Sequence, residues 1–560
     1  MNDPLAPWVE GLTIGQVLRE TARRLGDRDA LSFPQAGFRC NYAQLDGLVD
    51  DLARGLMAMG FERGDHFGVW STNWPEWVLL QFAAARAGVV LVKINPSYQL
   101  SEARYALAQS EIRGLALIER FKSCHYFQML EEICPELSSS APGTLVSADL
   151  PHLRLVVAMR GDAPPGMMGW ETLIRLGRDV TAEALSAREA QLRPDQPISL
   201  MYTSGTTGPP RGALLSHRNL LFNAFYAGAN MRLDERDRLC IPVPLYHCFG
   251  CVLGTLVSAI SGAAMIFPFE HFRPEATLDA IERERCTVIY GVPTMFIAEL
   301  EHASYPGRDL RSLRTGIMAG SPCPIELMRR VSESMGAREI TIGYGQTEAS
   351  PLITQTRHDD PIELRVGTVG PPLPGVEVKV IDPGSGREQP EGASGELCCR
   401  GHGVMMGYYR MPEQTARAID PEGWLHTGDL AIIGPDGYLR ITGRLKDIII
   451  RGGENISPYE IENILHHHPK VEDVHVVGIP DHKFGEEVLA SIKLRSGQSA
   501  TEDEIRSFCA RSLAHYKVPR LIRFVHDFPT TVTGKVQKYK IREEAVRELG
   551  LEAEDRIETA

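Results

Sequence analysis

One segment of the chain combines the residue types that bind phosphate groups. It runs Thr203-Ser204-Gly205-Thr206-Thr207-Gly208-Pro209-Pro210-Arg211-Gly212, between an apolar run and a segment with helical spacing. Its glycines allow the backbone to approach an anion closely, its hydroxyls can donate hydrogen bonds, and Arg211 adds positive charge. No Gly-Lys-Ser/Thr follows at the spacing of a P-loop. We predict a phosphate-binding loop of another kind, against the alternative of a plain Gly/Ser/Thr surface loop.

Further segments carry groups that suit a nucleotide. The run Tyr344-Gly345-Gln346-Thr347-Glu348 offers an aromatic face, a hydroxyl and a carboxylate, which fit a nucleotide and its divalent metal. Asp429 ends the run GWLHTGD, where its carboxylate can accept from both hydroxyls of a ribose. Arg444 in GRLKD adds a permanent positive charge. Lys535 stands alone at a predicted turn tip, which by itself is typical of a solvated surface charge.

These segments need a frame, and the hydrophobic pattern predicts one. From about Val9 to Gly370, short apolar runs alternate with amphipathic segments, as expected for the strands and crossover helices of a mixed or parallel sheet. His66–Trp70 is predicted as a strand, Trp77–Ala87 as a helix and Val89–Ile94 as the next strand. Further core strands are expected at Ile198–Tyr202, Ala264–Phe267, Val288–Tyr290, Thr315–Met318 and Glu339–Gly343. The fold class is therefore α/β, with a large body of layered α/β subdomains.

The pattern changes twice further along the chain. Short strands separated by Gly and Pro predict a small β-barrel-like subdomain at about residues 371–442, with strands at Val376–Ile381, Gly395–Arg400 and Tyr438–Thr442. An α-β-β-α-β order follows at Tyr459–His467, Val471–Ile479, Val488–Leu494, Glu502–Leu513 and Leu521–Val525. We expect an N-terminal domain at residues 1–445 and a small, mobile α+β domain at residues 446–560.

Composition argues against several classes of protein. The 560 residues are 43% hydrophobic and 23% charged, close to the average of soluble globular proteins. The 59 Lys and Arg against 72 Asp and Glu give a net charge of -13, which repels a nucleic-acid backbone. Nucleic acid is therefore not expected as the main partner.

Two segments bear on the location of the protein. The N-terminal run MNDPLAPWVEG shows neither a secretory nor a transit pattern, so a cytoplasmic location is predicted. Phe249–Phe269 lacks charged side chains over about one membrane-span length. Gly, Ser and Pro interrupt it, so a buried helix, a turn at Gly262 and a strand are preferred. No transmembrane segment is expected.

Cysteine and histidine give no metal pattern. The 11 Cys are odd in number and irregularly placed, and the adjacent pair Cys398-Cys399 matches no zinc or redox spacing, so reduced thiols are expected. His466, His467 and His468 are consecutive at a predicted helix end, so their side chains point in different directions. This disfavours a shared metal ion.

Seven segments, taken in order, resemble one known family. They are TSGTTGPPRG, PLYHCFG, YGQTE, GELCCRG, GWLHTGD, GRLKDIIIRGGENI and TGKVQK, and they span Thr203 to Lys538. The set resembles the adenylate-forming acyl-CoA synthetase and luciferase superfamily. MYTSGTTG, VPLYHCFG, GVPTMFIAELEH, LRTGIMAGSPCP and AHYKVPR are similar to its acyl-CoA synthetase family member 2 branch of medium-chain fatty acid–CoA ligases.

The resemblance implies a two-step ligase that uses ATP, CoA and Mg²⁺. A carboxylate would attack the α-phosphate of ATP and release pyrophosphate, and the CoA thiol would then displace AMP from the acyl-adenylate. Because two anions meet in the first step, the site needs metal and cationic groups. The family turns its small domain between the two steps, and here Lys446 matches the hinge position.

The resemblance also implies the site residues. The ATP site would comprise Thr203, Ser204, Gly205, Thr206, Thr207, Gly208, Pro209, Pro210, Arg211, Gly320, Ser321, Pro322, Tyr344, Gly345, Gln346, Asp429 and Arg444. Thr347 would contact the α-phosphate, Glu348 the Mg²⁺, and Lys535 both the carboxylate and the phosphate. His247, Phe249 and Met318 would line the acyl pocket, with a purely packed His as the alternative at His247. Gly452 and Gly453 would line the passage for CoA.

Several questions stay open at this point. Most family members have Lys where this chain has Arg211, and the planar guanidinium alters the contact with the pyrophosphate side. The motifs do not separate CoA from an acyl-carrier protein as the thiol acceptor. A catalytically impaired nucleotide-binding regulator is a further alternative, against which stands the retention of Glu348, Asp429, Arg444 and Lys535. Chain-length preference and oligomeric state are not encoded in these motifs, although homodimers are common in the family.

Overall fold

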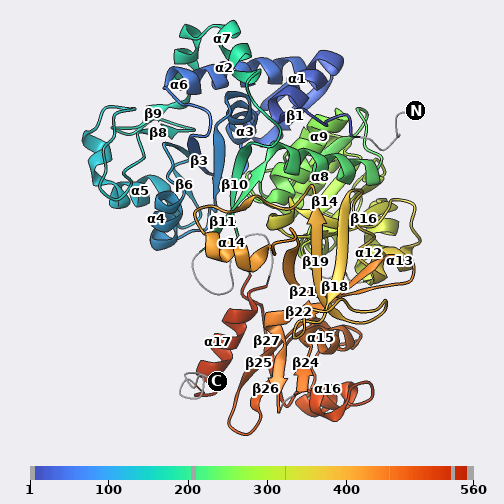
Figure 1. Ribbon diagram of the computed structural model, residues 1–560. Helices are drawn as coiled ribbons and strands as arrows, with labels where there is room; N and C mark the ends of the chain where they lie inside the picture. Colours follow the sequence, from blue (N-terminus) through green and yellow to red (C-terminus); the bar gives the residue numbers. More distant parts are fainter. Residues whose placement is uncertain are drawn as a thin grey trace. The chain divides into compact units, whose positions relative to one another are not determined.

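The computed structural model describes residues 7–203, 210–321, 323, 325–452, 454–530 and 536–551. The chain forms two compact units (Figure 1). The first comprises Met1–Glu377 and Cys399–Leu425, and the second comprises Val378–Cys398 and His426–Ala560. This mixed α/β architecture agrees with the predicted fold class. The domain border expected at Lys446 stays a prediction.

Each of the two large sheets in the first unit has eight strands. One has the order β20-β11-β10-β4-β3-β5-β8-β9. Its strands are β3 (His66–Trp70), β4 (Val90–Ile94), β5 (Gly114–Leu117), β8 (Leu155–Ala158), β9 (Met168–Gly169), β10 (Pro197–Thr203), β11 (Arg211–Ser216) and β20 (Gly407–Tyr408). Strands β3, β4 and β5 are fully buried, which is typical of a parallel sheet covered on both faces. The antiparallel strands β11 and β20 extend this sheet beyond β10.

The other large sheet has the order β17-β16-β15-β14-β12-β13-β1-β2. Its strands are β1 (Asp29–Phe33), β2 (Phe38–Asn41), β12 (Arg238–Cys240), β13 (Ala264–Ile266), β14 (Val288–Gly291), β15 (Thr315–Ala319), β16 (Glu339–Gly345) and β17 (Leu352–Gln355). Strands β14, β15 and β16 are parallel neighbours. Their carboxyl ends therefore lie at one edge of the sheet, which is where ligands bind in open α/β sheets.

Helices connect and cover the strands of the first unit. They are α1 (Ile14–Leu25), α2 (Tyr42–Ala58), α3 (Pro75–Ala87), α4 (Leu100–Gln109), α5 (Tyr126–Ile133), α6 (Trp170–Leu176), α7 (Ala182–Glu189), α8 (His217–Asn230), α9 (Thr255–Ser261), α10 (Pro274–Arg283), α11 (Pro293–Glu301), α12 (Ile325–Arg330), α13 (Ile362–Gly367) and α14 (Pro412–Ala418). Beyond its first turn, helix α3 has no exposed face, because every residue from Trp77 to Ala87 is buried. Helix α8 begins with a capping box in which Ser216 and Asn219 bond each other's backbone.

The second unit contains most of a four-stranded sheet with the order β18-β19-β21-β22. Its strands are β18 (Val376–Ile381), β19 (Gly395–Gly401), β21 (Leu425–Ile433) and β22 (Leu439–Arg444). A second sheet contains β23 (Ile449–Arg451), β24 (Glu454–Ile456), β25 (Val471–Asp481), β26 (Gly485–Leu494) and β27 (Leu521–Val525). The helices α15 (Pro458–His466), α16 (Glu502–Cys509) and α17 (Lys538–Glu548) accompany it.

Most predicted elements are confirmed, and the differences are local. Helix α16 ends at Cys509, so the predicted helix to Leu513 is too long. The short hairpin β23–β24 and the helix α17 were not predicted, because neither carries a strong apolar period. His466 ends α15, and His467 and His468 lie just beyond it. Their side chains take separate partners, since His467 Nδ1 contacts Asn463 O and the His468 ring packs on Phe508.

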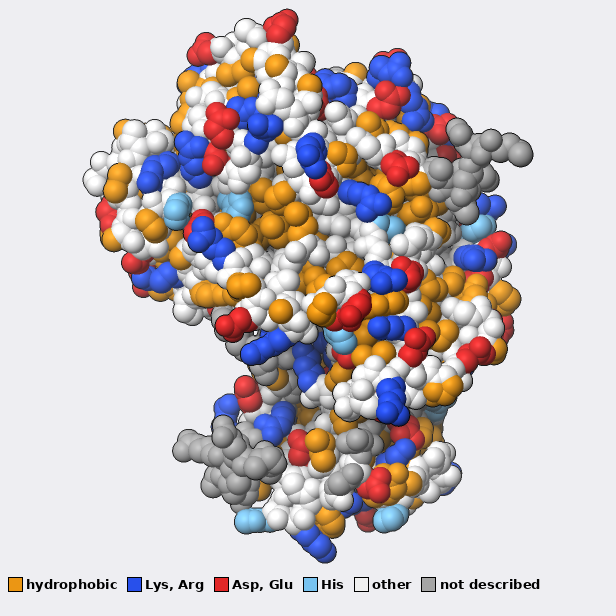
Figure 2. All heavy atoms as spheres, viewed as in Figure 1, with side chains coloured by type: hydrophobic (Ala, Val, Ile, Leu, Met, Phe, Trp, Pro, Cys, Tyr) orange, Lys and Arg blue, Asp and Glu red, His pale blue; other side chains and the backbone are white. Residues whose placement is uncertain are grey.

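The uncharged stretch Phe249–Phe269 contains the predicted helix, turn and strand. A π-helical turn (Phe249–Gly254) leads into α9, Gly262 ends that helix, and β13 follows. Within the part of the chain that the structure describes, no helix is both long enough and apolar enough to span a membrane. On the face shown in Figure 2, cationic and anionic side chains are intermixed.

Candidate functional site

Two strands hold the ends of the predicted phosphate loop. Thr203 ends β10 and Arg211 begins β11, and these two residues are paired across the antiparallel ladder. The Thr203 hydroxyl also donates to Arg211 O at 3.3 Å. Pro210 is described, whereas Ser204, Gly205, Thr206, Thr207, Gly208 and Pro209 lie outside the described residues. The two ends of the loop are therefore held together as a phosphate cradle requires.

Arg211 and Glu348 meet through one tyrosine. The Arg211 guanidinium lies 5.5 Å from the centroid of the Tyr408 ring, within the range of a cation–π contact. The Tyr408 hydroxyl donates to Glu348 Oε1 at 2.8 Å. Burial and the negative charge of Glu348 raise the pKa of Tyr408 well above its ordinary value, so the phenol stays a neutral donor. The structure thus brings together the predicted triphosphate and metal ligands.

Buried hydrogen bonds fix the turn that carries Glu348. The Asn223 amide of α8 donates to Leu352 O at 2.7 Å and to Ala349 O at 3.3 Å, and it accepts from Leu352 N at 3.1 Å. Met405 N donates to Glu348 O at 2.9 Å. Because Asn223 is fully buried, these bonds are protected from competing water.

Two glycines allow the backbone to approach closely at the predicted adenine site. A Cβ atom on Gly345 would lie 1.9 Å from Pro351 O, and Gln346 N donates to that same oxygen at 2.9 Å. Gly320 follows β15 with φ +94, a conformation that favours glycine. Gly320 and Ser321 follow β15 and are exposed. Tyr344 and Gln346 lie at the end of β16 and are half-buried. Pro322 lies outside the described residues.

His247 lies close to the residue predicted to contact the α-phosphate. Phe249 N donates to His247 Nδ1 at 3.2 Å, so this nitrogen carries no proton. The Cys248 sulfur lies 3.5 Å from the same nitrogen and 3.8 Å from Thr347 Oγ1. Burial raises the pKa of the Cys248 thiol to about 12, which fits a packing role rather than a nucleophile.

The other predicted acyl-pocket residues are buried. Phe249 packs on Tyr290 with ring centroids 5.4 Å apart. Met318 is fully buried in β15 and is paired with Gly291 of β14. Tyr290 is paired with Ile317, one residue before Met318, so Met318 points to the opposite face of the sheet, into the core cluster that contains Ile289. The prediction that Met318 lines the same pocket as Phe249 is therefore wrong.

Asp429 and Arg444 are cross-strand partners in the second unit. They are paired in the ladder between β21 and β22. Arg444 Nε donates to Asp429 Oδ1 at 2.7 Å, and only 4% of Asp429 is exposed. Such a charge-assisted bond holds the carboxylate in one orientation. The two residues that the sequence predicts beside the ribose are therefore in direct contact.

The predicted hinge and CoA-passage residues lie further along the second unit. Lys446 is exposed in a short 3-10 turn (Leu445–Asp447) directly after β22. Gly452 directly follows β23, and its N–H donates to Phe484 O at 2.7 Å. Gly453 and Lys535 lie outside the described residues.

Glu348 fits a divalent cation. Its carboxylate accepts from the neutral phenol of Tyr408, and among the described residues it forms no ion pair with Lys, Arg or His. A half-buried carboxylate without a cationic partner is a suitable ligand for Mg²⁺. The residues present thus fit the metal that ATP brings.

Sequence reasoning missed the residues that position the site. Tyr408 lies in GVMMGYYR, where nothing distinguishes it from a packed aromatic residue. Asn223 gave a weak signal, because a polar side chain with poor helix propensity stands in an otherwise apolar helix. Glu396 and His426, which contact the turn before Asp429, were not singled out either.

Comparison with known proteins agrees with this geometry. The family model for AMP-binding enzymes matches residues 18–409, and the model for the C-terminal domain of AMP-binding enzymes matches residues 460–535. YngI of Bacillus subtilis (strain 168), whose name provisionally assigns it as an acyl-CoA synthetase, is 48% identical over 96% of this chain and 98% of its own. The medium-chain acyl-CoA ligase ACSF2, mitochondrial, of Danio rerio is 44% identical over 97% of this chain and 90% of its own.

A solved structure shows the same architecture. The anthranilate CoA ligase AuaEII, in complex with anthranoyl-AMP, has a TM-score of 0.85 and 27% identity, over 96% of this chain and 98% of that one. The family models together cover most of the chain, and the relatives match almost its full length. The chain therefore belongs to the family of AMP-binding enzymes.

Proposed function

We propose that the protein is an ATP-dependent ligase that joins a medium-chain fatty carboxylate to CoA through an acyl-adenylate. The observation that carries the proposal is the link from Arg211 through Tyr408 to Glu348, which joins the phosphate loop to a carboxylate suited to the metal of ATP. Near full-length similarity to ligases that are named for acyl-CoA synthesis supports it.

In the first step, a carboxylate oxygen of the substrate attacks the α-phosphorus of ATP. The bond to the bridging oxygen breaks, pyrophosphate leaves, and the acyl-adenylate remains. Arg211 and the hydroxyls of the phosphate loop would hold the leaving pyrophosphate, and Thr347 would donate to the α-phosphate. Charge from fixed groups lowers the barrier because two anions must approach each other.

Mg²⁺ would be held by Glu348 and the phosphates, where it neutralises charge on the phosphate oxygens. Tyr408 would orient the Glu348 carboxylate through its hydrogen bond. Asp429 would accept from the ribose hydroxyls, and Arg444 would keep Asp429 in place. The adenine would lie against Tyr344 and the exposed Gly320.

In the second step, the CoA thiol attacks the acyl carbon and AMP leaves with the former carboxylate oxygen. We propose that the segment after Lys446 turns between the two steps and brings Gly452 and Gly453 to the path of the thiol. Backbone dihedrals at a single exposed residue can absorb such a turn. A Cβ atom on Gly452 would lie 3.1 Å from the Phe484 ring, so the role of Gly452 in the CoA passage rests on the family resemblance.

Lys535 is proposed to contact both the carboxylate and the α-phosphate during the first step, because a Lys ammonium can reach two oxygens as a point charge. Lys535→Ala should then lose pyrophosphate release but still convert a supplied acyl-adenylate to thioester at close to the wild-type rate. Equal slowing of both half-reactions would remove Lys535 from this role.

The medium-chain preference rests on the named activity of the Danio rerio relative. His247 and Phe249 are proposed to line the acyl pocket, whereas Met318 packs on the other face of the sheet. A cytoplasmic location and a homodimer stay predictions. Cell fractionation tests the location, and sedimentation tests the oligomeric state. The Danio rerio relative is itself named mitochondrial.

The proposal is tested by pyrophosphate release from Mg-ATP with straight-chain and branched carboxylates, with and without CoA. We expect release that depends on the carboxylate and turns over only with CoA, with its maximum at medium chain length. A single burst that ignores CoA would indicate an enzyme that loads an acyl-carrier protein. No release with any acid would indicate a nucleotide-binding regulator.

A further inference from the structure

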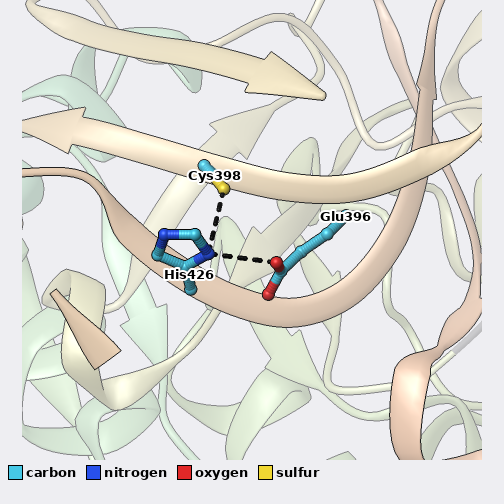
Figure 3. A group of neighbouring side chains, drawn as sticks. All are labelled: Glu396, Cys398 and His426. Atoms are coloured by element: carbon cyan, nitrogen blue, oxygen red, sulfur yellow. Dashed lines mark hydrogen bonds and ion pairs between the residues drawn. The ribbon is translucent and has the colours of Figure 1, made fainter. Parts of the chain in front are cut away.

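Three metal-ligating side chains meet at one point in the second unit, and the proposed ligase reaction uses none of them. They are Glu396 and Cys398 of β19 and His426 of β21 (Figure 3). Their ligand atoms all lie within 4.8 Å of one another. His426 Nδ1 is 3.0 Å from Glu396 Oε2 and 3.6 Å from Cys398 Sγ.

The pleat of the sheet explains this convergence. Residues two apart on a strand point to the same face, so Glu396 and Cys398 project side by side. His426 lies on β21, the hydrogen-bonded neighbour of β19. Cys399, one residue further, points to the opposite face. The cluster is therefore not visible as a motif in the sequence, because its three members belong to two separate segments.

The ligand set and the spacing fit a zinc-class ion. Zinc in proteins binds thiolate, imidazole and carboxylate, at about 2.3 Å for sulfur and about 2.0–2.2 Å for nitrogen and oxygen. Tetrahedral bonds of these lengths place ligand atoms about 3.3–3.8 Å apart. The distance of 3.6 Å from Cys398 to His426 already meets this, and the distance of 3.0 Å to Glu396 needs to open by a few tenths of an ångström. Three protein ligands leave the fourth position for water.

The surroundings support metal binding by the same groups. The second oxygen of Glu396, Oε1, accepts from Gly428 N at 3.2 Å, so the carboxylate is oriented while Oε2 faces His426. Cys398 is fully buried and Glu396 is 8% exposed, which limits competition from water. The His426 side chain is 29% exposed and provides the route by which an ion enters.

We propose that Glu396, Cys398 and His426 form a binding site for a divalent transition-metal ion of the zinc class, separate from the Mg²⁺ that accompanies ATP. Binding replaces the thiol proton of Cys398, which is released to solvent. The ion also takes the place of the direct contact between His426 and Glu396, because both side chains then bind the ion.

The site adjoins the turn that leads to Asp429. Gly428 N donates to Glu396, the Thr427 hydroxyl donates to Leu397 O at 2.7 Å, and Asp429 N donates to Thr427 Oγ1 at 3.1 Å. An ion on Glu396 and His426 therefore fixes the turn from both sides. We therefore expect metal occupancy to change the KM for ATP more than kcat. This expectation rests on the ribose role proposed for Asp429.

Titration of the metal-free full-length protein with Co²⁺ tests the site directly. We expect one Co²⁺ per chain, with a near-ultraviolet thiolate-to-cobalt charge-transfer band and the visible bands of a tetrahedral ion, and displacement by Zn²⁺. Cys398→Ser should abolish the charge-transfer band. Cys399→Ser is the matched control, and it should keep the band because its side chain lies on the other face of the strand.

Glu396→Gln serves as the second variant, since its amide oxygen still accepts from Gly428 N and preserves the turn. It should weaken Co²⁺ binding roughly 10- to 100-fold. Circular dichroism of each variant without metal shows whether the fold is retained. A protein without the charge-transfer band, or with a band that Cys398→Ser leaves unchanged, would reduce the cluster to a hydrogen-bonded triad and overturn the proposal. Because this readout needs no ATP or carboxylate, its failure is distinguishable from failure of the proposed ligase activity.

Discussion

Two carboxylates that are proposed to bind ATP are held in opposite ways. Glu348 in the first unit accepts a hydrogen bond of 2.8 Å from a neutral phenol. Asp429 in the second unit accepts a bond of 2.7 Å from the guanidinium of Arg444. A neutral donor leaves the full negative charge of Glu348 for a cation, whereas Arg444 offsets the charge of Asp429 and leaves a fixed acceptor. The difference supports a metal ligand at the first position and a ribose ligand at the second.

The frames around the two carboxylates also differ. The turn of Glu348 is tied to the buried Asn223 of α8, so it is part of the core of the first unit. The strand of Asp429 pairs with β22, and the exposed Lys446 follows at the end of that strand. A fixed ATP site and an adjustable segment after Lys446 are what a two-step reaction requires.

The largest effect is expected when Glu348 loses its charge. Glu348→Gln keeps an acceptor for Tyr408 but cannot neutralise a cation, so kcat/KM for pyrophosphate release should fall roughly 100- to 1000-fold. Glu111→Gln is the control, because Glu111 also accepts from a tyrosine, Tyr409, at 2.8 Å, and it pairs in addition with Arg410 at 2.8 Å. A loss of the same size in both variants would show a structural effect and not a metal ligand.

The next effect separates the two half-reactions. Lys446→Pro fits the 3-10 turn seen here but fixes φ, so it should slow thioester formation roughly 100-fold through misplacement of the segment after Lys446. Pyrophosphate release in the absence of CoA should stay close to wild type. Single-turnover assays of each half-reaction measure this, and equal slowing of both would argue against a hinge at Lys446.

A smaller effect is expected at Asp429. Asp429→Asn removes the charge-assisted bond from Arg444 and one acceptor for the ribose, so the KM for ATP should rise roughly 10-fold. The rate at saturating ATP should change much less, in contrast to Glu348→Gln. Initial-rate measurements against ATP concentration decide this. A fall in kcat with unchanged KM would mean that Asp429 acts on the chemical step.

The smallest effect is expected at Tyr408. Tyr408→Phe keeps the ring beneath Arg211 but removes the donor to Glu348, so kcat/KM should fall roughly 5- to 10-fold. Since the pKa of Tyr408 is raised, the phenol keeps its proton as the pH rises toward the ordinary tyrosine pKa of about 10. Wild type and Tyr408→Phe should therefore have parallel alkaline pH profiles. Tyr409→Phe should leave activity unchanged, and a loss there equal to that of Tyr408→Phe would contradict the link to Glu348.

The fold could be predicted where the apolar pattern is strong. His66–Trp70, Val376–Ile381 and Leu521–Val525 were each expected with the bounds that β3, β18 and β27 have. The end of α16 at Cys509 was missed, because the residues beyond it keep a helix-like pattern while the backbone turns. Element ends depend on tertiary contacts more than on local preference.

The site was predictable only in part. Motifs predict roles for Arg211, Glu348, Asp429 and Arg444, because phosphate, metal and ribose need particular residue types, and these roles stay predictions. They did not identify Tyr408, which reaches Glu348 from 60 positions away in the chain. Nor did they identify the cluster of Glu396, Cys398 and His426, since its members come from two strands. Contacts of this kind are created by the sheets and leave no local spacing in the sequence.

The transfer of a labelled oxygen tests the proposed acyl-adenylate most directly. A medium-chain carboxylate with an oxygen-isotope label on both carboxylate oxygens is incubated with the protein, Mg-ATP and CoA. The masses of the products are then measured by mass spectrometry. Attack on the α-phosphorus predicts one labelled oxygen in AMP and one in the acyl-CoA, with none in pyrophosphate. Label in free phosphate or pyrophosphate, or unlabelled AMP alongside acyl-CoA, would contradict activation through an acyl-adenylate.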